Sequence, residues 1–110
     1  MNLYLKNEEG KHAFVYVVNG QMARLKFNLD LKDLDDEIYD IVVPKNTWTM
    51  TESFFSGLFS ESIEYLGLEK FKQKYVFKYV DKNKKLVEIL EKTAIENLKS
   101  VVKYNEIYLK

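Results

Sequence analysis

The chain has no cysteine, a single proline, and four glycines that stand apart from one another at positions 10, 20, 57 and 67. Without cysteine there is no thiolate metal site and no cysteine nucleophile. Isolated glycines also exclude the clustered glycine loop that surrounds a bound phosphate. The sequence therefore predicts no metal and no cofactor.

Net charge and long apolar runs are missing as well. Lysine plus arginine and aspartate plus glutamate number 17 each, so no overall field attracts nucleic acid or an anionic membrane. No apolar run approaches the roughly 18 residues of a membrane span, and residues 1–11 show no signal-peptide pattern. We expect a soluble cytoplasmic protein whose partner is recognised by shape or by a local patch.

A catalytic constellation is not recognisable in the sequence. The 110 residues are expected to form one domain, 1–110, that buries roughly 65% of its unfolded surface. The acidic residues between Asp30 and Asp40 lack the central glycine and terminal glutamate of a calcium loop. We interpret them as a solvated loop. General acid–base catalysis needs two convergent titratable groups, and none is indicated, so the chain is predicted not to be an enzyme.

The first third of the chain favours strands joined by hairpins. Residues 3–5 and 13–18 are rich in β-formers, and the turn residues 7–10 separate them. Asn19-Gly20 is a strong hairpin signal, and apolar and polar residues alternate from 25 to 32 at the strand period. We therefore expect N-terminal β-hairpins, with a helix over residues 21–27 as the alternative.

The middle of the chain predicts a strand followed by an aromatic helix. Residues 38–43 end in the apolar Ile41-Val42-Val43, which is typical of a central strand covered on both faces. The helix begins at Thr49 or Thr51, because Thr49 and Glu52 have the spacing of a capping box, and Gly67 ends it. Hydroxyl groups at a helix N-terminus mark a place that favours an anion or a phosphate.

The last third predicts one more strand and a long helix. We expect a short turn or helical extension at 68–71, a strand over 75–80, an amphipathic helix over 85–103 and a terminal edge strand over 106–109. Strands followed by strand, helix, strand and helix are typical of an α/β fold. The predicted architecture is a mixed sheet of four to six strands with at least two helices packed on it.

Part of the chain, residues 41–98, resembles the STAS-like domains of unknown function of bacteria and phages, which are related in fold to anti-sigma factor antagonists. The residues that carry the resemblance are Ser53-Phe54, Leu58-Phe59 and Leu66-Gly67-Leu68. It implies a STAS-like sheet and a protein partner, often an ATPase-type kinase. It also implies a phosphoacceptor at the start of the helix, which falls on Ser53, with Thr51 as the second candidate. Serine and threonine are also common N-cap residues of helices, so a purely structural capping role is the alternative for each of them.

The helix at 52–66 carries more apolar residues than the stripe of about 100° that one core-facing side can bury. We assign to the core Phe55, Phe59, Ile63 and Leu66. The candidate residues for a partner interface are Phe54, Leu58, Tyr65 and, before the helix, Trp48. The predicted function is a non-enzymatic regulatory module that binds a protein or a second copy of itself. The alternative is a small phage or mobile-element inhibitor of a host protein, or an oligomeric structural protein.

Overall fold

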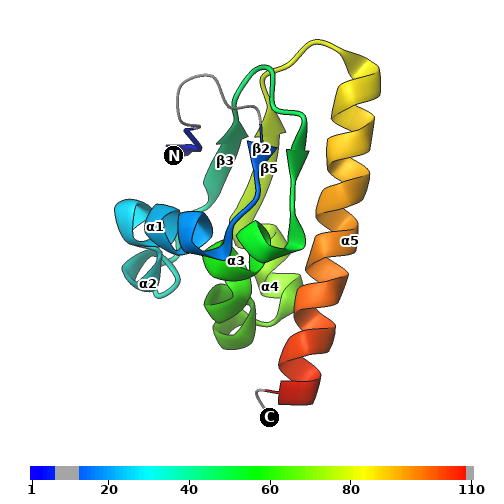
Figure 1. Cartoon of the computed structure of the whole chain (residues 1–110). Coiled ribbons are helices and arrows are strands. Elements are labelled where there is room, and N and C mark those ends of the chain that lie inside the picture. Colours follow the sequence, from blue (N-terminus) through cyan, green and yellow to red (C-terminus); the bar gives the residue numbers. More distant parts are fainter. Residues whose placement is uncertain (7–12, 109–110) are drawn as a thin grey trace.

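Three parallel strands form the main sheet of the computed structural model, which describes residues 1–6 and 13–108 (Figure 1). The central strand β3 (Tyr39–Val43) pairs with β1 (Asn2–Tyr4) on one side and with β5 (Tyr75–Tyr79) on the other. A second, two-stranded parallel sheet joins β2 (Ala13–Phe14) to β4 (Thr49–Met50). The predicted α/β class and the central position of residues 41–43 are confirmed.

The predicted N-terminal hairpins and mixed sheet are wrong. All pairs among the described strands are parallel, and β1 and β2 belong to different sheets. Asn19-Gly20 lies inside helix α1 (Val17–Phe27), and the alternating residues after it lie in α1 and α2 (Leu29–Lys32). Parallel pairing joins residues that are far apart along the chain, so a local turn signal does not report it. The turn predicted at 7–10 lies outside the described residues.

The remaining helices follow the sequence pattern more closely. Helix α3 (Glu52–Leu66) starts directly after Thr51, the second of the two predicted starts, and ends at Gly67 as predicted. The predicted Thr49–Glu52 capping box is wrong, because Thr49 lies in β4. The expected extension after Gly67 is helix α4 (Leu68–Lys74). Helix α5 (Lys84–Tyr108) is longer than predicted, so the terminal edge strand is wrong for residues 106–108, while 109 lies outside the described residues. A helix satisfies its backbone by itself, whereas an edge strand needs a neighbour to pair with.

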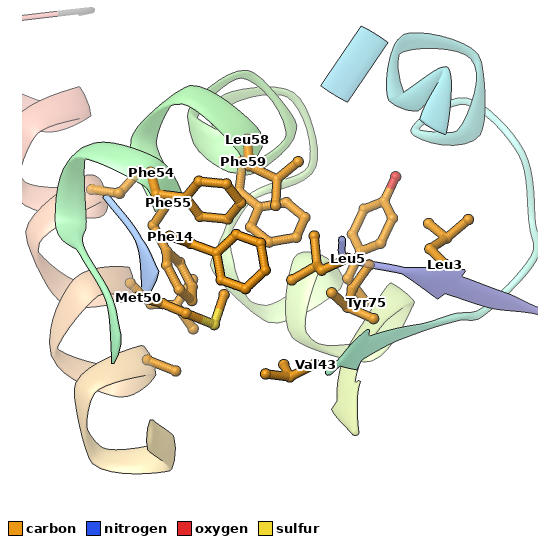
Figure 2. Close-up of a cluster of buried hydrophobic side chains, with 14 of the residues drawn as sticks. Leu3, Leu5, Phe14, Val43, Met50, Phe54, Phe55, Leu58, Phe59 and Tyr75 are labelled. Atoms are coloured by element: carbon orange, nitrogen blue, oxygen red, sulfur yellow. The ribbon is translucent and has the colours of Figure 1, made fainter. Parts of the chain in front are cut away.

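Helix α3 lies at the centre of the molecule, with α1 packed on one side and α5 on the other (Figure 1). Beneath it, aromatic rings from α3, α4 and β5 form much of the core. The ring centroids of Phe59 lie 4.9 Å from Phe71, 5.7 Å from Tyr75 and 5.8 Å from Phe77. Figure 2 shows Phe14, Phe54 and Phe55 beside them, toward β2 and β4. This core fixes the start of α3 and the side of it on which α1 rests.

Helices α1 and α3 touch backbone to backbone at two glycines. A Cβ atom built on Gly20 would lie 2.2 Å from the carbonyl oxygen of Phe54, and one built on Gly57 would lie 2.2 Å from that of Val17. Any other residue at either position would push the helices apart. The Asn19-Gly20 pair therefore serves a helix crossing and not a hairpin turn.

Candidate functional site

The two candidate phosphoacceptors, Thr51 and Ser53, have different surroundings at the N-terminus of α3. The hydroxyl of Thr51 accepts a hydrogen bond from the Phe54 backbone N–H at 3.3 Å and donates one to the Val15 carbonyl at 2.6 Å. Thr51 thus caps the helix and ties it to the segment that follows β2. Ser53 is exposed in the first turn of α3. Of the two residues, Ser53 is the more exposed.

The contact patch predicted on α3 is wrong for two of its members. Phe54 and Leu58 are 1% and 0% exposed, because α1 covers the side of α3 on which they lie. Tyr65 and Trp48 are exposed, at 64% and 65%. Trp48 precedes β4 and Tyr65 lies in the last turn of α3, so the 15-residue helix separates them. The structure does not bring the four predicted residues together on one surface.

An exposed apolar surface lies instead on α1. Val18, Met22 and Leu25 are spaced by four and three residues, so they share one side of the helix, and they are 53%, 63% and 77% exposed. We call these three residues the outward face of α1. The opposite side, with Gly20 and Arg24, is buried against α3. The sequence does not reveal this face, because its pattern predicts strands over 13–18 and 25–32 joined at Asn19-Gly20, where the structure has α1.

Further exposed apolar and acidic residues follow the end of α1 along the chain. Leu31 and Leu34 are also exposed, at 63% and 62%. The exposed carboxylates of this region, which we call the acidic rim, belong to Asp30, Asp36, Glu37 and Glu61. The amino group of Lys32 is hydrogen-bonded to the Phe27 carbonyl. Asp30 and Glu61 form ion pairs with Arg24, whereas Asp36 and Glu37 offer their carboxylates beside Leu34 to a partner.

A buried polar cluster lies behind α1 and joins four separate segments. The guanidinium of Arg24 donates to Asp33 at 2.8 Å and to the Ser62 hydroxyl at 2.7 Å. Ser62 and Tyr75 both donate to the Asp33 carboxylate, at 2.8 Å and 2.5 Å. The expectation of a fully solvated acidic loop is therefore wrong for Asp33, which is 6% exposed. Ion pairing offsets the cost of burying a charge in such a place.

The protonation states of this cluster follow from its contacts. Burial raises the pKa of Tyr75, and its hydrogen bond to Asp33 raises that pKa further. Burial by itself lowers the pKa of Arg24, but hydrogen bonds to Asp33 and Asp30 outweigh it and leave the pKa above its usual value. Among the described residues, every fully buried side-chain nitrogen or oxygen has a hydrogen-bond partner. The cluster thus joins α1, α3 and β5 around the carboxylate of Asp33.

A second ionic contact ties the acidic stretch to the end of α4. The Lys74 amino group lies 2.7 Å from Asp35 Oδ1 and also donates to the carbonyls of Asp35 and Glu37. The hydrogen bond from Lys74, aided by one from Tyr39, lowers the pKa of Asp35 to about 2. The hydrogen bond to Asp35 in turn raises the pKa of Tyr39 to about 12. This contact holds residues 35–37 against α4.

Comparisons with known proteins found no relatives. No protein-family model matches the chain, and neither a curated protein nor a solved structure matches it. Within residues 1–6 and 13–108, no group of three or more histidine, aspartate or glutamate side chains is arranged to hold a metal ion. No helix in that part of the chain is long and apolar enough to cross a membrane.

Proposed function

We propose that this protein is a non-enzymatic regulatory module that binds another protein through the outward face of α1. One observation carries the proposal: the fold buries the side of α1 that carries Gly20 and Arg24, and it leaves the apolar outward face exposed. Val18, Met22 and Leu25 give water an apolar stripe that costs free energy to expose. Aliphatic side chains at this spacing are the usual anchors of a helix-mediated contact.

The charges beside this face select the chemistry of the partner. The acidic rim favours a partner whose apolar contact surface is bordered by lysine or arginine. A second copy of the chain would bring a second acidic rim to the same interface, and like charges would oppose the contact. We therefore propose a basic-bordered protein partner and expect the isolated chain to be monomeric.

The resemblance to STAS-like domains supports the same class of function and suggests an ATPase-type kinase as the partner. Ser53 lies one turn before Gly57, which touches Val17 at the start of α1. A phosphate on Ser53 would thus lie near the start of α1, at the opposite end of that helix from Asp30, where the proposed contact is made by the apolar Val18. The dipole at the start of α3 tolerates this charge, whereas a packed partner surface must desolvate it. We propose that phosphorylation of Ser53 releases the partner.

The test begins by locating the contact in the source cell. A photoreactive amino acid is placed at position 25 on the outward face or, as a matched control, at position 78, an exposed residue of β5. We expect one protein to be crosslinked from position 25 and not from position 78. That protein is then purified, and its affinity for the chain is measured by calorimetry at two salt concentrations.

The variants then decide whether the outward face is the contact. Val18→Asp combined with Leu25→Asp should weaken binding at least roughly thirtyfold, the loss typical of removing hot-spot residues. Lys78→Asp should leave the affinity unchanged, Ser53→Asp should weaken it, and Ser53→Ala should not. Because the altered side chains are exposed, the melting temperature should stay close to that of the original chain. Equal affinity for all variants would contradict the proposal.

A further inference from the structure

A cavity of about 300 Å³ lies between α1 and the strands β1 and β2. Its floor is apolar and deeply buried: Leu5, Phe14 and Phe54 are 3%, 5% and 1% exposed. Figure 2 shows these three side chains in the same part of the core, and the rings of Phe14 and Phe54 are 4.9 Å apart. Ala23 and Phe27 of α1 form a half-buried wall. An occupant of this floor must be apolar, because a polar atom would find no hydrogen bond there.

The mouth of the cavity is polar and positively charged. Lys6, after β1, and Lys26, on α1, both line it and are both exposed. Neither lysine forms an ion pair with another described residue, and no described lining residue is acidic. Asn19 and Tyr4 also line the cavity and have polar side chains, and the Tyr4 hydroxyl accepts a hydrogen bond from Asn2. The two lysines therefore suit an anionic group placed above an apolar floor.

We propose that this cavity binds a single-chain amphiphilic acid, with its carboxylate at Lys6 and Lys26 and its hydrocarbon tail over Phe14 and Phe54. The volume sets the length of the tail. A cavity of about 150 Å³ accepts benzene, with six carbon atoms, so one of about 300 Å³ has room for roughly twelve. A medium-chain carboxylic acid fits, and a two-chain lipid does not. Apolar pockets with a few convergent polar groups are the usual form of small-molecule sites.

This inference does not depend on the proposed protein contact. Met22 borders both surfaces, so the variants that test the cavity are placed elsewhere. The probe is sodium decanoate below its critical micelle concentration, titrated into the full chain in a calorimeter. We expect one binding site. Decanol, which lacks the charge, should bind about tenfold more weakly, while butyrate and decylammonium should not bind detectably.

Charge variants test the mouth of the cavity. An exposed ion pair changes affinity by up to about fivefold, so Lys6→Glu combined with Lys26→Glu should weaken decanoate binding at least about tenfold. Lys72→Glu combined with Lys78→Glu is the matched control, since both lysines are exposed and lie outside the cavity. The control should bind decanoate as the original chain does. Equal binding by both double variants would overturn the assignment of the carboxylate.

A variant that fills the cavity tests whether the hydrocarbon tail binds over the apolar floor. Ala23→Phe places a ring in the cavity and should abolish decanoate binding, with circular dichroism showing that the chain remains folded. A second measurement does not depend on any variant: decanoate should shift the methyl resonances of Leu5 and Ala23 in the NMR spectrum of the original chain. Shifts confined to other residues would overturn the proposal. So would binding to phosphatidylglycerol vesicles in place of free decanoate.

Discussion

Gly57→Ala is the sharpest test of the packing between α1 and α3. The new Cβ atom would lie 2.2 Å from the Val17 carbonyl oxygen, whereas ordinary contact begins at 3.4 Å. The two helix backbones must therefore separate by the difference, about 1.2 Å. The obstructing atoms belong to the backbone, so no side-chain rotation relieves the clash. Phe54 and Leu58 are buried at this crossing and would lose contacts as α1 moves.

Two opposing effects set the size of the change. Alanine favours a helix over glycine by up to about 1 kcal/mol. Overpacking costs about 1–3 kcal/mol, and more where the surroundings cannot adjust. We expect a net loss of about 2 kcal/mol in the free energy of unfolding. For a domain of this size, that corresponds to a fall of about 8–16 °C in melting temperature.

Urea unfolding followed by far-ultraviolet circular dichroism measures this loss as a lower midpoint with an unchanged slope. Gln21→Ala is the matched control, because Gln21 is exposed on α1, the other helix of the crossing, next to Gly20. The control should stay within about 0.5 kcal/mol of the original chain. If Gly57→Ala were as stable as the control, the close crossing of α1 and α3 would be refuted.

The remaining predictions concern the ionic contacts and the helix cap. Arg24→Met leaves the buried carboxylate of Asp33 unpaired and should cost about 3–5 kcal/mol, while the further change Asp33→Asn should recover part of the loss in a double-mutant cycle. Asp35 has a pKa lowered from 3.8 to about 2 in the folded state, so its contribution is present above pH 3.8 and lost as the pH falls toward 2. Lys74→Met should therefore flatten this part of the stability profile, measured by urea unfolding between about pH 5 and pH 2. Thr51→Ala should cost about 1 kcal/mol in thermal unfolding, and no measurable loss would contradict its capping role.

Helices and strands that have a clear pattern in a few consecutive residues were predicted correctly from the sequence. The apolar run before Pro44 identified β3, the alternation of aromatic and β-branched residues identified β5, and the spacing of apolar residues identified α5. Gly67 marked the end of α3, and the hydroxyl residues placed its start at Thr49 or Thr51, because capping depends on a few consecutive residues. Ser53 could likewise be placed in the first turn of α3 before the structure was known.

The first third of the chain was decided by tertiary contacts. Residues 17–27 have β-branched residues and a hairpin signal, yet they form a helix because Gly20 allows α1 to pack closely on α3. The pairing of β1 with β3 joins residues more than 35 positions apart, and no local pattern reports such a contact. Local propensity is a weak effect that packing of this kind overrides.

For the candidate sites as well, some features followed from the sequence and others only from the tertiary structure. Composition and periodicity placed the apolar residues on α3, but only the position of α1 shows that Phe54 and Leu58 are covered. The polar cluster collects Arg24, Ser62 and Tyr75 around a single carboxylate from separate segments. The exposed stripe on α1 and the cavity beside it exist because that helix has one side against α3 and the other toward water. Sequence periodicity determines which residues share a side of a helix, and only the packing of the whole chain determines which side is buried.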